Sequence, residues 1–270
     1  MITSIRNDII KEAQKLYQRK YRERYQRFLT EGLEIIRFGL NSGRAPLSVF
    51  YCTEMFQDQM TWELLNRIQG LESDLIEVNS QVIYHLSQRE IPQGILVTFP
   101  IFDTEINNLK LESNDGQILL LILDRLQDPG NLGTLIRTAD AVGAAGVILI
   151  ESSVDPFDQK SISASAGSLF SVPLFRTSNI AELFNQLSSK LTIIGTNNVA
   201  KTIAWSNGVL NNSIALILGN EARGISADVS QYVDKWVKLP IVGQAESLNV
   251  SVAGGTLLYF WLKQKLDRND

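Results

Sequence analysis

The chain has 270 residues, 44% of them hydrophobic, which is enough for one large α/β domain or two smaller ones and does not suggest disorder. The net charge of −4 excludes a surface coated with positive charge, and no apolar run approaches the roughly 20 residues that cross a bilayer, so we expect a soluble cytoplasmic protein. Cys52 and His85 are the only cysteine and histidine, which excludes an intrachain disulfide and leaves no basis for Cys/His metal sites or Ser/His/Asp triads.

The first 27 residues are rich in basic side chains with aromatic residues among them. Such a segment binds phosphates and stacks on unpaired bases, or it forms a solvated amphipathic helix whose aromatic side chains pack on its own domain. The sequence leaves both interpretations open. The residues concerned are the basic Arg6, Lys11, Lys15, Arg19, Lys20, Arg22, Arg24 and Arg27, the acidic Asp8, Glu12 and Glu23, and the aromatic Tyr17, Tyr21, Tyr25 and Phe28.

The next elements predict a small α/β domain. Residues 27–43 (RFLTEGLEIIRFGLNSG) predict an amphipathic helix that ends at a glycine, and residues 61–69 predict another helix. Residues 48–53 (SVFYCT) and 94–99 (GILVTF) are typical of strands. The polar run 112–117 (ESNDGQ) is typical of a linker, so we predict one domain over residues 1–112 and a second over 117–270.

From residue 118 the strands lose their polar alternation. The runs 118–123, 146–150, 191–195 and 214–218 are short and continuously apolar, which indicates a parallel sheet covered by helices on both faces. Helical patterns at 134–143 and 179–189 lie between these runs. We predict a final helix over 247–265 whose buried face carries Val250, Ala253, Gly254, Leu257, Leu258 and Trp261.

Three loops combine glycine with polar side chains, and each follows a predicted strand. They are residues 127–133 (QDPGNLG), 219–224 (GNEARG) and 242–249 (VGQAESLN). Ligands of open α/β sheets bind beyond the carboxyl ends of the strands, so these loops are the candidate site. A dinucleotide-binding G-x-G-x-x-G at the first helix and a P-loop are both absent from the sequence, which disfavours NAD enzymes and P-loop NTPases.

Residues 128–149 (DPGNLGTLIRTADAVGAAGVIL), 216–226 (LILGNEARGIS) and 239–255 (LPIVGQAESLNVSVAGG) together resemble the SpoU (TrmH-type) RNA ribose methyltransferases of the SPOUT superfamily. The segment EGLEIIRFGL (31–40) resembles a small α/β RNA-binding domain like ribosomal protein L30e. The resemblance implies an α/β fold whose parallel sheet carries a deep trefoil knot, and a homodimer with the active site near the subunit contact. It also implies transfer of a methyl group from S-adenosyl-L-methionine to a ribose 2′-hydroxyl of structured RNA.

The resemblance assigns catalytic roles to Arg137, Asn131 and Glu221. A 2′-hydroxyl is a poor nucleophile, so a neighbouring group must accept its proton or stabilise the alkoxide. Arginine keeps its proton, which makes electrostatic stabilisation by Arg137 easier than a role as base, and both stay open. Without the resemblance, Arg137 reads as a surface residue paired with Asp140 or Asp128, Asn131 as a helix N-cap, and Glu221 as an acid at a helix start.

The last loop supplies two further catalytic candidates, Ser247 and Asn249, with a serine N-cap as the alternative for Ser247. Ala253, Gly254 and Gly255 are expected to allow close packing of the final helix. The resemblance implies that backbone groups bind the methyl donor, and these positions are Gly219, Leu239 and Leu248, with Thr196 and Ile241 as further candidates. Residues 161–175 are assigned to the rim of the site without a chemical role.

The N-terminal extension favours ribosomal RNA over transfer RNA as substrate, an inference by analogy between folds. Two other functions stay open on the sequence: a non-catalytic RNA-binding factor on the same fold, and a methyltransferase that modifies a base. The basic segment predicts salt-sensitive RNA binding that neutralising substitutions at its lysines and arginines reduce.

Overall fold

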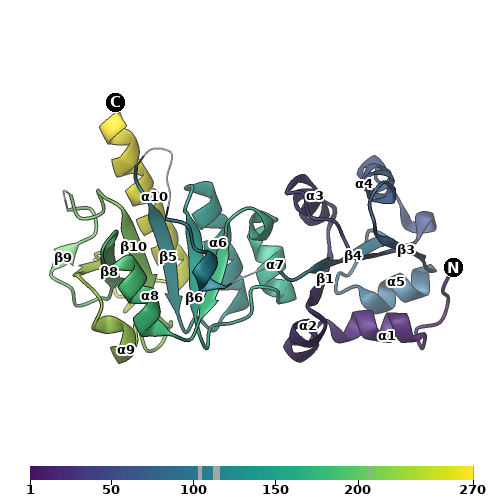
Figure 1. Ribbon diagram of the computed structural model, residues 1–270, viewed down its shortest axis with the longest axis horizontal. Coiled ribbons are helices and arrows are strands. Elements are labelled where there is room, and N and C mark those ends of the chain that lie inside the picture. The colour runs from purple at the N-terminus through teal and green to yellow at the C-terminus, as the bar shows by residue number, and fades with distance from the viewer. Residues whose placement is uncertain (103–104, 112–115, 207, 270) are drawn as a thin grey trace. The chain divides into compact units, whose positions relative to one another are not determined.

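The computed structural model describes residues 1–102, 105–111, 116–206 and 208–269, and it forms two compact units (Figure 1). Unit 1 comprises Met1–Phe102 and Phe157–Phe170, and unit 2 comprises Asp103–Pro156 and Ser171–Asp270. Residues 112–115 of the predicted linker lie outside the described residues, so the domain boundaries stay predictions. No helix among the described residues is long and apolar enough to cross a membrane.

Unit 1 is built on a four-stranded sheet with the order β1-β4-β2-β3, in which β2 and β3 are parallel and the other pairs antiparallel. The predicted strands at 48–53 and 94–99 and the helix at 61–69 are confirmed. Its elements are α1 (Asp8–Lys15), α2 (Arg19–Tyr25), β1 (Arg27–Glu31), α3 (Leu33–Asn41), β2 (Ser48–Tyr51), η1 (Thr53–Met55), α4 (Gln59–Gln69), β3 (Asp74–Glu77), α5 (Ser80–Leu86), β4 (Ile95–Pro100), α7 (Gln159–Ser165) and η3 (Ser168–Phe170).

The prediction of one helix over residues 27–43 is wrong, because strand β1 precedes helix α3 there. Phe28, Leu29 and Thr30 are consecutive and all buried, which a strand covered on both faces allows and a surface helix does not. Gly32 separates the two elements with a φ of 107°, in the region that favours glycine. Pairing of β1 with β4 therefore outweighs the helical pattern of the segment.

A cluster of phenylalanines joins residues 157–170 to unit 1. The Phe28 ring lies 5.0 Å from the Phe157 ring and 6.2 Å from that of Phe170, and the Phe99 and Phe170 rings are 5.0 Å apart. Residues 161–175 were expected at the rim of the site, but those up to Phe170 belong to unit 1. The buried aromatic contacts are the physical reason for this difference.

Unit 2 holds a seven-stranded sheet with the order β7-β6-β5-β10-β8-β11-β9, and every strand pair in it is parallel. Four of its strands confirm the four apolar runs predicted from the sequence. The elements are η2 (Ile106–Asn108), β5 (Leu119–Asp124), α6 (Pro129–Ala141), β6 (Gly146–Ile150), β7 (Leu174–Thr177), α8 (Ile180–Leu187), β8 (Thr192–Thr196), β9 (Thr202–Ile203), β10 (Ile214–Leu218), α9 (Ala227–Ser230), β11 (Lys235–Lys238) and α10 (Val250–Asn269).

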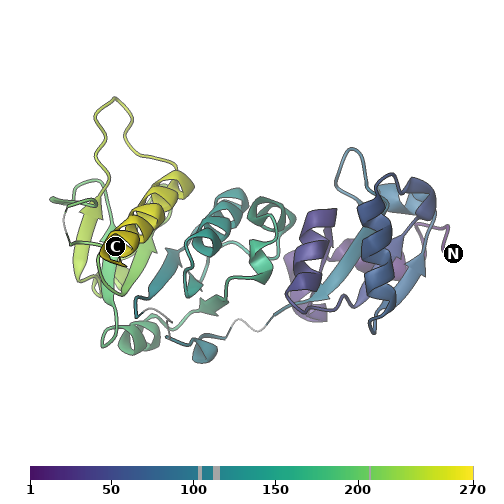
Figure 2. The same ribbon diagram turned by 90° about the horizontal axis from the view of Figure 1, so that it is seen from above.

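Helices cover both faces of this sheet, as the continuous apolar strands predicted. Helices α6 and α10 lie side by side on one face, while α8 and α9 pack on the other (Figures 1 and 2). At Gly254 of α10 an added Cβ would lie 2.5 Å from the Leu135 side chain and 2.6 Å from that of Leu218, so a larger residue would displace these side chains. Trp261 is buried on the same face and donates from Nε1 to the Asn212 carbonyl at 3.1 Å.

Candidate active site

The loops that follow β5, β10 and β11 lie at one edge of the unit 2 sheet, since carboxyl ends of parallel strands meet there. Asn131 stands in the first turn of α6. The N-cap of this helix is Asp128, whose Oδ1 accepts from the Asn131 backbone N–H at 2.7 Å. The interpretation of Asn131 as an N-cap is therefore wrong, and its side chain is available for other contacts.

Three of the predicted catalytic side chains form a hydrogen-bonded chain. Asn249 donates from Nδ2 to Asn131 Oδ1 at 3.0 Å, and Asn131 donates from Nδ2 to Glu221 Oε1 at 3.2 Å. The carboxylate only accepts, so Asn131 must present its amide nitrogen to Glu221 and its oxygen to Asn249. The orientation of both amides is thus fixed by their partners, and we call these three residues the Asn–Asn–Glu chain.

Asn249 is also the residue that caps α10. Its Oδ1 accepts from the backbone N–H of Ser251 at 2.9 Å and of Val252 at 3.3 Å, two groups without partners inside the helix. The alternative of Ser247 as the N-cap is wrong, and so is a helix start at that residue, because α10 begins at Val250. The hydrogen bonds of the Asn–Asn–Glu chain therefore run in one direction, from the backbone N–H groups at the start of α10 to the Glu221 carboxylate.

Glu221 lies in a tight turn, so the expectation of a helix start at this residue is wrong. The turn is closed by a pair of hydrogen bonds between Asn220 and Gly224, at 3.1 and 2.8 Å. The Asn220 side chain accepts from the N–H groups of Ala222 and Arg223, both at 3.0 Å. The helix dipole does not explain Glu221, since the next helix, α9, begins only at Ala227.

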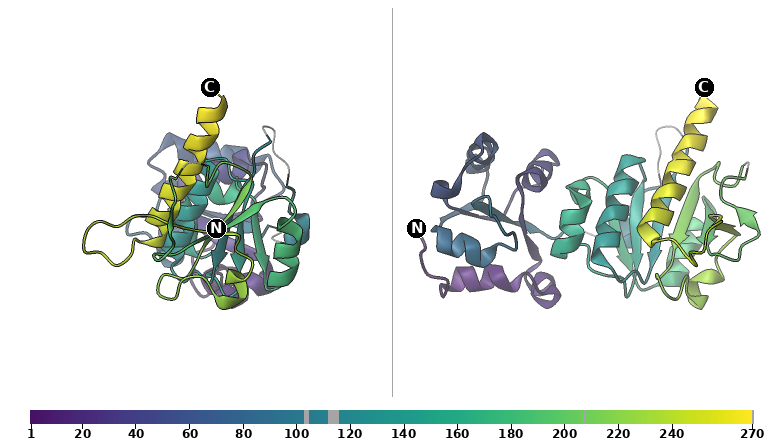
Figure 3. Two further views of the ribbon diagram at one scale, coloured as in Figure 1. Left: turned by 90° about the vertical axis from the view of Figure 1, so that its left-hand side faces the viewer. Right: turned by 180° about the vertical axis from the view of Figure 1, so that it is seen from behind.

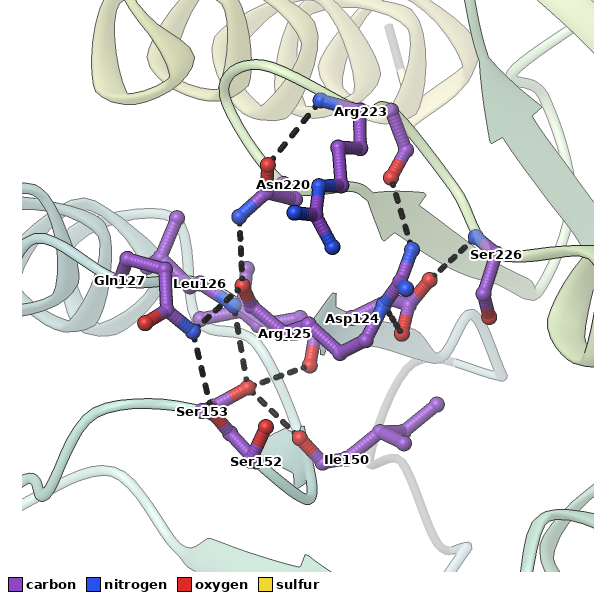
Figure 4. A network of polar contacts seen from close by, with 12 residues as sticks. Asp124, Arg125, Leu126, Gln127, Ile150, Ser152, Ser153, Asn220, Arg223 and Ser226 are labelled. Carbon is purple, nitrogen blue, oxygen red and sulfur yellow. Dashed lines mark hydrogen bonds and ion pairs between the residues drawn. The ribbon is translucent and has the colours of Figure 1, made fainter.

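A polar network holds this turn against the end of β5 (Figure 4). Asp124 is 1% exposed and its carboxylate accepts from the Ser226 backbone N–H at 2.5 Å and from Arg125 Nε at 3.2 Å. Asn220 donates from Nδ2 to the Arg125 carbonyl at 3.0 Å. Sequence reasoning missed these residues, although polar side chains directly after an apolar strand were the available signal.

A cavity of about 570 Å³ opens beside the turn, within the size range of small-molecule sites. Every residue predicted to bind the methyl donor lines it, and so do the catalytic candidates Glu221 and Ser247. The predicted residues are Thr196, Gly219, Leu239, Ile241 and Leu248. Asn131, Glu221 and Asn249 line an adjoining shallow recess with Gln127 and Asp128, so Glu221 belongs to both hollows.

The cavity is bounded by a long exposed loop. Residues 242–249 are exposed, and Figure 3 shows this yellow-green segment projecting from unit 2. Two hydrogen bonds hold its far end: Asn198 donates from Nδ2 to the Glu246 carbonyl at 2.9 Å, and Asn249 donates to Asn131 as described above. The loop therefore covers the cavity from one side through few contacts with the body of the unit.

Arg137 lies apart from these hollows. It is exposed on α6, and six residues after Asn131 it points about 240° further around the helix axis. Arg137 takes part in none of the ion pairs among the described residues, so the alternative of a surface arginine paired with Asp140 or Asp128 is wrong. Among the described residues, Arg137 neither bonds to the Asn–Asn–Glu chain nor lines the recess beside it.

Among the described residues, no group of three or more His, Cys, Asp and Glu side chains is arranged to hold a metal ion.

The model of the SpoU rRNA methylase family matches residues 118–259, more than half of the chain. The chain belongs to this family. A second model, the MRM3-like substrate binding domain, matches residues 7–97.

Two curated relatives cover most of the chain. The 23S rRNA (guanosine-2′-O-)-methyltransferase RlmB of Haemophilus ducreyi is 34% identical over 217 residues, covering 78% of this chain and 87% of that protein. The 23S rRNA (guanosine(2553)-2′-O)-methyltransferase RlmP of Bacillus subtilis is 30% identical over 265 residues, covering 96% and 97%.

Solved structures of similar proteins extend over the whole chain. An AdoMet-bound rRNA methyltransferase from Sinorhizobium meliloti has a TM-score of 0.86 at 27% identity and covers 97% of both chains. The SpoU methyltransferase AviRb from Streptomyces viridochromogenes, in complex with the cofactor AdoMet, has a TM-score of 0.88 at 25% identity and covers 97% of this chain and 99% of that one. The predicted α/β class with a parallel SpoU-type sheet is confirmed, while the trefoil knot stays a prediction.

Proposed function

We propose that this protein is an S-adenosyl-L-methionine-dependent methyltransferase that modifies a ribose 2′-hydroxyl of ribosomal RNA. The observation that carries the proposal is the Asn–Asn–Glu chain, which stands at the edge of a cavity lined by all five predicted donor-binding residues. Relatives that methylate a guanosine 2′-oxygen of 23S rRNA support the substrate class. A cytoplasmic location is part of the proposal.

The cavity suits the methyl donor in shape and charge. Apolar side chains such as Leu239 and Leu248 provide a wall for an adenine ring, and Gly219 contributes to the lining beside them. The donor supplies a methyl group made electrophilic by a positively charged sulfonium. Glu221 and Glu246 bring two carboxylates to the lining against one cation, Lys238, so the lining stays net negative and attracts a cationic ligand.

The side chains around the recess position the ribose in this proposal. Asn131 and Asn249 have fixed amide orientations, so their remaining hydrogen-bonding capacity faces the recess in a defined way. Ser247 lines the donor cavity and adds a hydroxyl on that side. As the 2′-oxygen bonds to the methyl group, the methyl–sulfur bond of the donor breaks and the hydroxyl proton passes to water, and Arg137 is proposed to stabilise the negative charge that develops on the oxygen.

Arg137 is proposed to act in the site of a second copy of the chain. Its exposure and its direction away from Asn131 support this arrangement. The face of α10 supports a homodimer as well, since Val252, Tyr259 and Leu266 follow one another at intervals of seven residues and are 54–55% exposed. The same spacing places three apolar side chains along one stripe of the helix.

The test is methyl transfer from radiolabelled S-adenosyl-L-methionine to unmodified ribosomal RNA, followed by digestion to nucleosides. We expect label in a 2′-O-methylated nucleoside, lost with Asn131→Ala and with Arg137→Ala, and kept with Arg268→Ala, an exposed arginine of the same unit. Label in a base would refute the ribose assignment. Donor binding without transfer to any RNA or ribosomal particle would favour a non-catalytic RNA-binding factor.

Co-expression of the Asn131→Ala and Arg137→Ala chains tests the homodimer. If Arg137 serves the partner's site, a mixed dimer holds one site with both residues intact, so part of the activity returns. If both residues serve the site of their own chain, each site of a mixed dimer lacks either Asn131 or Arg137, so activity stays lost. Size-exclusion chromatography with light scattering gives the oligomeric state independently.

A further inference from the structure

Two tyrosines on α2 form a stacked pair at the surface of unit 1. The rings of Tyr21 and Tyr25 have centroids 6.0 Å apart and planes inclined by 16°. Both side chains are only half-buried, in contrast to Phe28, which is 0% exposed in the core of the unit. The sequence left two interpretations of the basic, aromatic segment: RNA binding, or packing of its aromatic side chains on the domain. Phe28 packs in the core, whereas the tyrosine pair stays at the surface.

Cationic side chains surround this pair. Lys15 and Lys20 place their ammonium groups 5.5 and 4.8 Å from the centroid of the Tyr21 ring. Arg24 and Arg27 place their guanidinium groups 5.7 and 5.6 Å from the centroid of the Tyr25 ring. We call these two tyrosines and four cations the tyrosine–cation platform.

Three of the four platform charges have no acidic partner among the described residues. Within residues 15–27 six basic residues stand against Glu23 alone, a local charge of +5 in a chain whose net charge is −4. Glu23 pairs with Arg19, and Glu12 pairs with Arg27. In the part of the chain that the structure describes, Lys15, Lys20 and Arg24 are exposed and form no ion pair.

A buried arginine fixes the platform to the body of unit 1. Arg22 is 2% exposed, and its Nη1 donates to the carbonyls of Leu16 and Tyr17, both at 2.9 Å. These carbonyls end the preceding helical segment, so the bond sets the angle at which α2 leaves it. Tyr17 contributes by donating from its hydroxyl to the Leu86 carbonyl. The tyrosine pair is thus held in place before any ligand arrives.

We propose that the tyrosine–cation platform binds an unpaired stretch of the RNA substrate. Every base has a π-face that stacks on tyrosine, and the neighbouring phosphates accept the lysine and arginine donors. Lys15, Lys20 and Arg24 are exposed, so their charged groups move from ring to phosphate without disturbing the fold. An A-form duplex keeps its bases stacked inside, and the platform therefore selects single strands or loops.

This inference rests on the proposed function in one respect, that RNA is the substrate. The test measures binding of fluorescently labelled oligouridylate to the full chain by anisotropy over a series of salt concentrations, with an RNA duplex of equal length as comparison. The first variant, Tyr21→Leu with Tyr25→Leu, keeps apolar area and removes the π-faces. The second, Tyr21→Phe with Tyr25→Phe, keeps the rings.

We expect the leucine pair to weaken oligouridylate binding by about fivefold or more, and the phenylalanine pair to bind like the wild type. Lys15→Gln, Lys20→Gln and Arg24→Gln together should lower the slope of log affinity against log salt by about 2. The charge-matched control of Arg37→Gln, Arg67→Gln and Arg89→Gln, exposed residues of the same unit outside the basic segment, should change the slope less.

Wild-type affinity in the leucine pair would overturn the proposal, and so would equal slopes for the platform and control variants. Tighter binding of the duplex, or of phosphatidylcholine/phosphatidylserine vesicles, would assign the platform to a different partner and overturn it too. Circular dichroism of each variant checks that the helices remain. Binding of oligouridylate needs no methyl transfer, so a platform that binds while no RNA is labelled would contradict the proposed function alone.

Discussion

Gly219→Ala tests whether the turn after β10 forms the donor cavity. A Cβ at residue 219 would lie 2.2 Å from the carbonyl carbon of Gly224 and 2.3 Å from the backbone nitrogen of Ile225, where contacts under 3.0 Å essentially never occur. Both neighbours are backbone atoms, so the two sides of the turn must separate by about 1 Å. That separation stretches the hydrogen bonds between Asn220 and Gly224, now 3.1 and 2.8 Å.

We expect two measurable consequences of this substitution. Overpacking of this kind costs about 1–3 kcal/mol, which corresponds to a fall in Tm of roughly 2–12 °C for a unit of this size. Donor affinity should fall as well, because the turn carries Gly219 and Glu221 into the cavity lining. Differential scanning calorimetry and titration calorimetry with S-adenosyl-L-methionine measure the two effects.

Gly243→Ala is the matched control. Gly243 lies in the loop on the other side of the site, and a Cβ there would meet nothing within 4 Å. This variant should keep both Tm and donor affinity. If Gly219→Ala keeps wild-type affinity and Tm, the close approach of residues 219 and 224 does not shape the cavity, and the reasoning fails.

Three further predictions follow from the described contacts. Asn131→Asp sets a second carboxylate against Glu221, so transfer should fall at neutral pH and recover partly as pH decreases, as a pH–rate profile would reveal. Gly254→Ala should lower the free energy of unfolding, measured by urea titration, by about 1–3 kcal/mol. An added Cβ at Gly255 lies 3.9 Å from its nearest neighbour, so Gly255→Ala should raise the free energy of unfolding by up to about 1 kcal/mol. Equal effects of the two substitutions would contradict the packing argument. Burial raises the pKa of the Cys52 thiol, so a smaller fraction of the thiol is ionised at neutral pH. A disulfide reagent should therefore label Cys52 only when the protein unfolds, and rapid labelling of the native protein would contradict this prediction.

The sheet of unit 2 was predictable because its strands are covered on both faces. A strand such as Gly146–Ile150 is apolar at every position, which no exposed strand and no surface helix tolerates. The face of α10 was predictable for a related reason, since Gly254, Leu257 and Trp261 recur at helical spacing and are buried. In both cases the positions that are buried away from water must be apolar or small, and their spacing reveals the type of element.

The turn at Glu221 shows where local reasoning failed. Glycine, asparagine and glutamate in succession are typical of a helix start, yet Asn220 bonds instead to the Arg125 carbonyl, 95 positions away in the chain. The same limit applies to β1, whose pairing with β4 outweighs a helical pattern. Contacts between distant residues decide such segments, and a single sequence carries no direct signal of them.

The Asn–Asn–Glu chain joins loops that are 90 and 118 positions apart, but it does not hold them together. Its hydrogen bonds are exposed, and bonds of this kind contribute about 0.5–1.5 kcal/mol each at most. The loops are fixed by buried features instead, namely the Asp124 carboxylate, the approach at Gly219 and the packing of Gly254. Substitutions of Asn131 and Glu221 should therefore reduce methyl transfer while leaving Tm nearly unchanged, whereas substitutions at the buried positions should reduce both together.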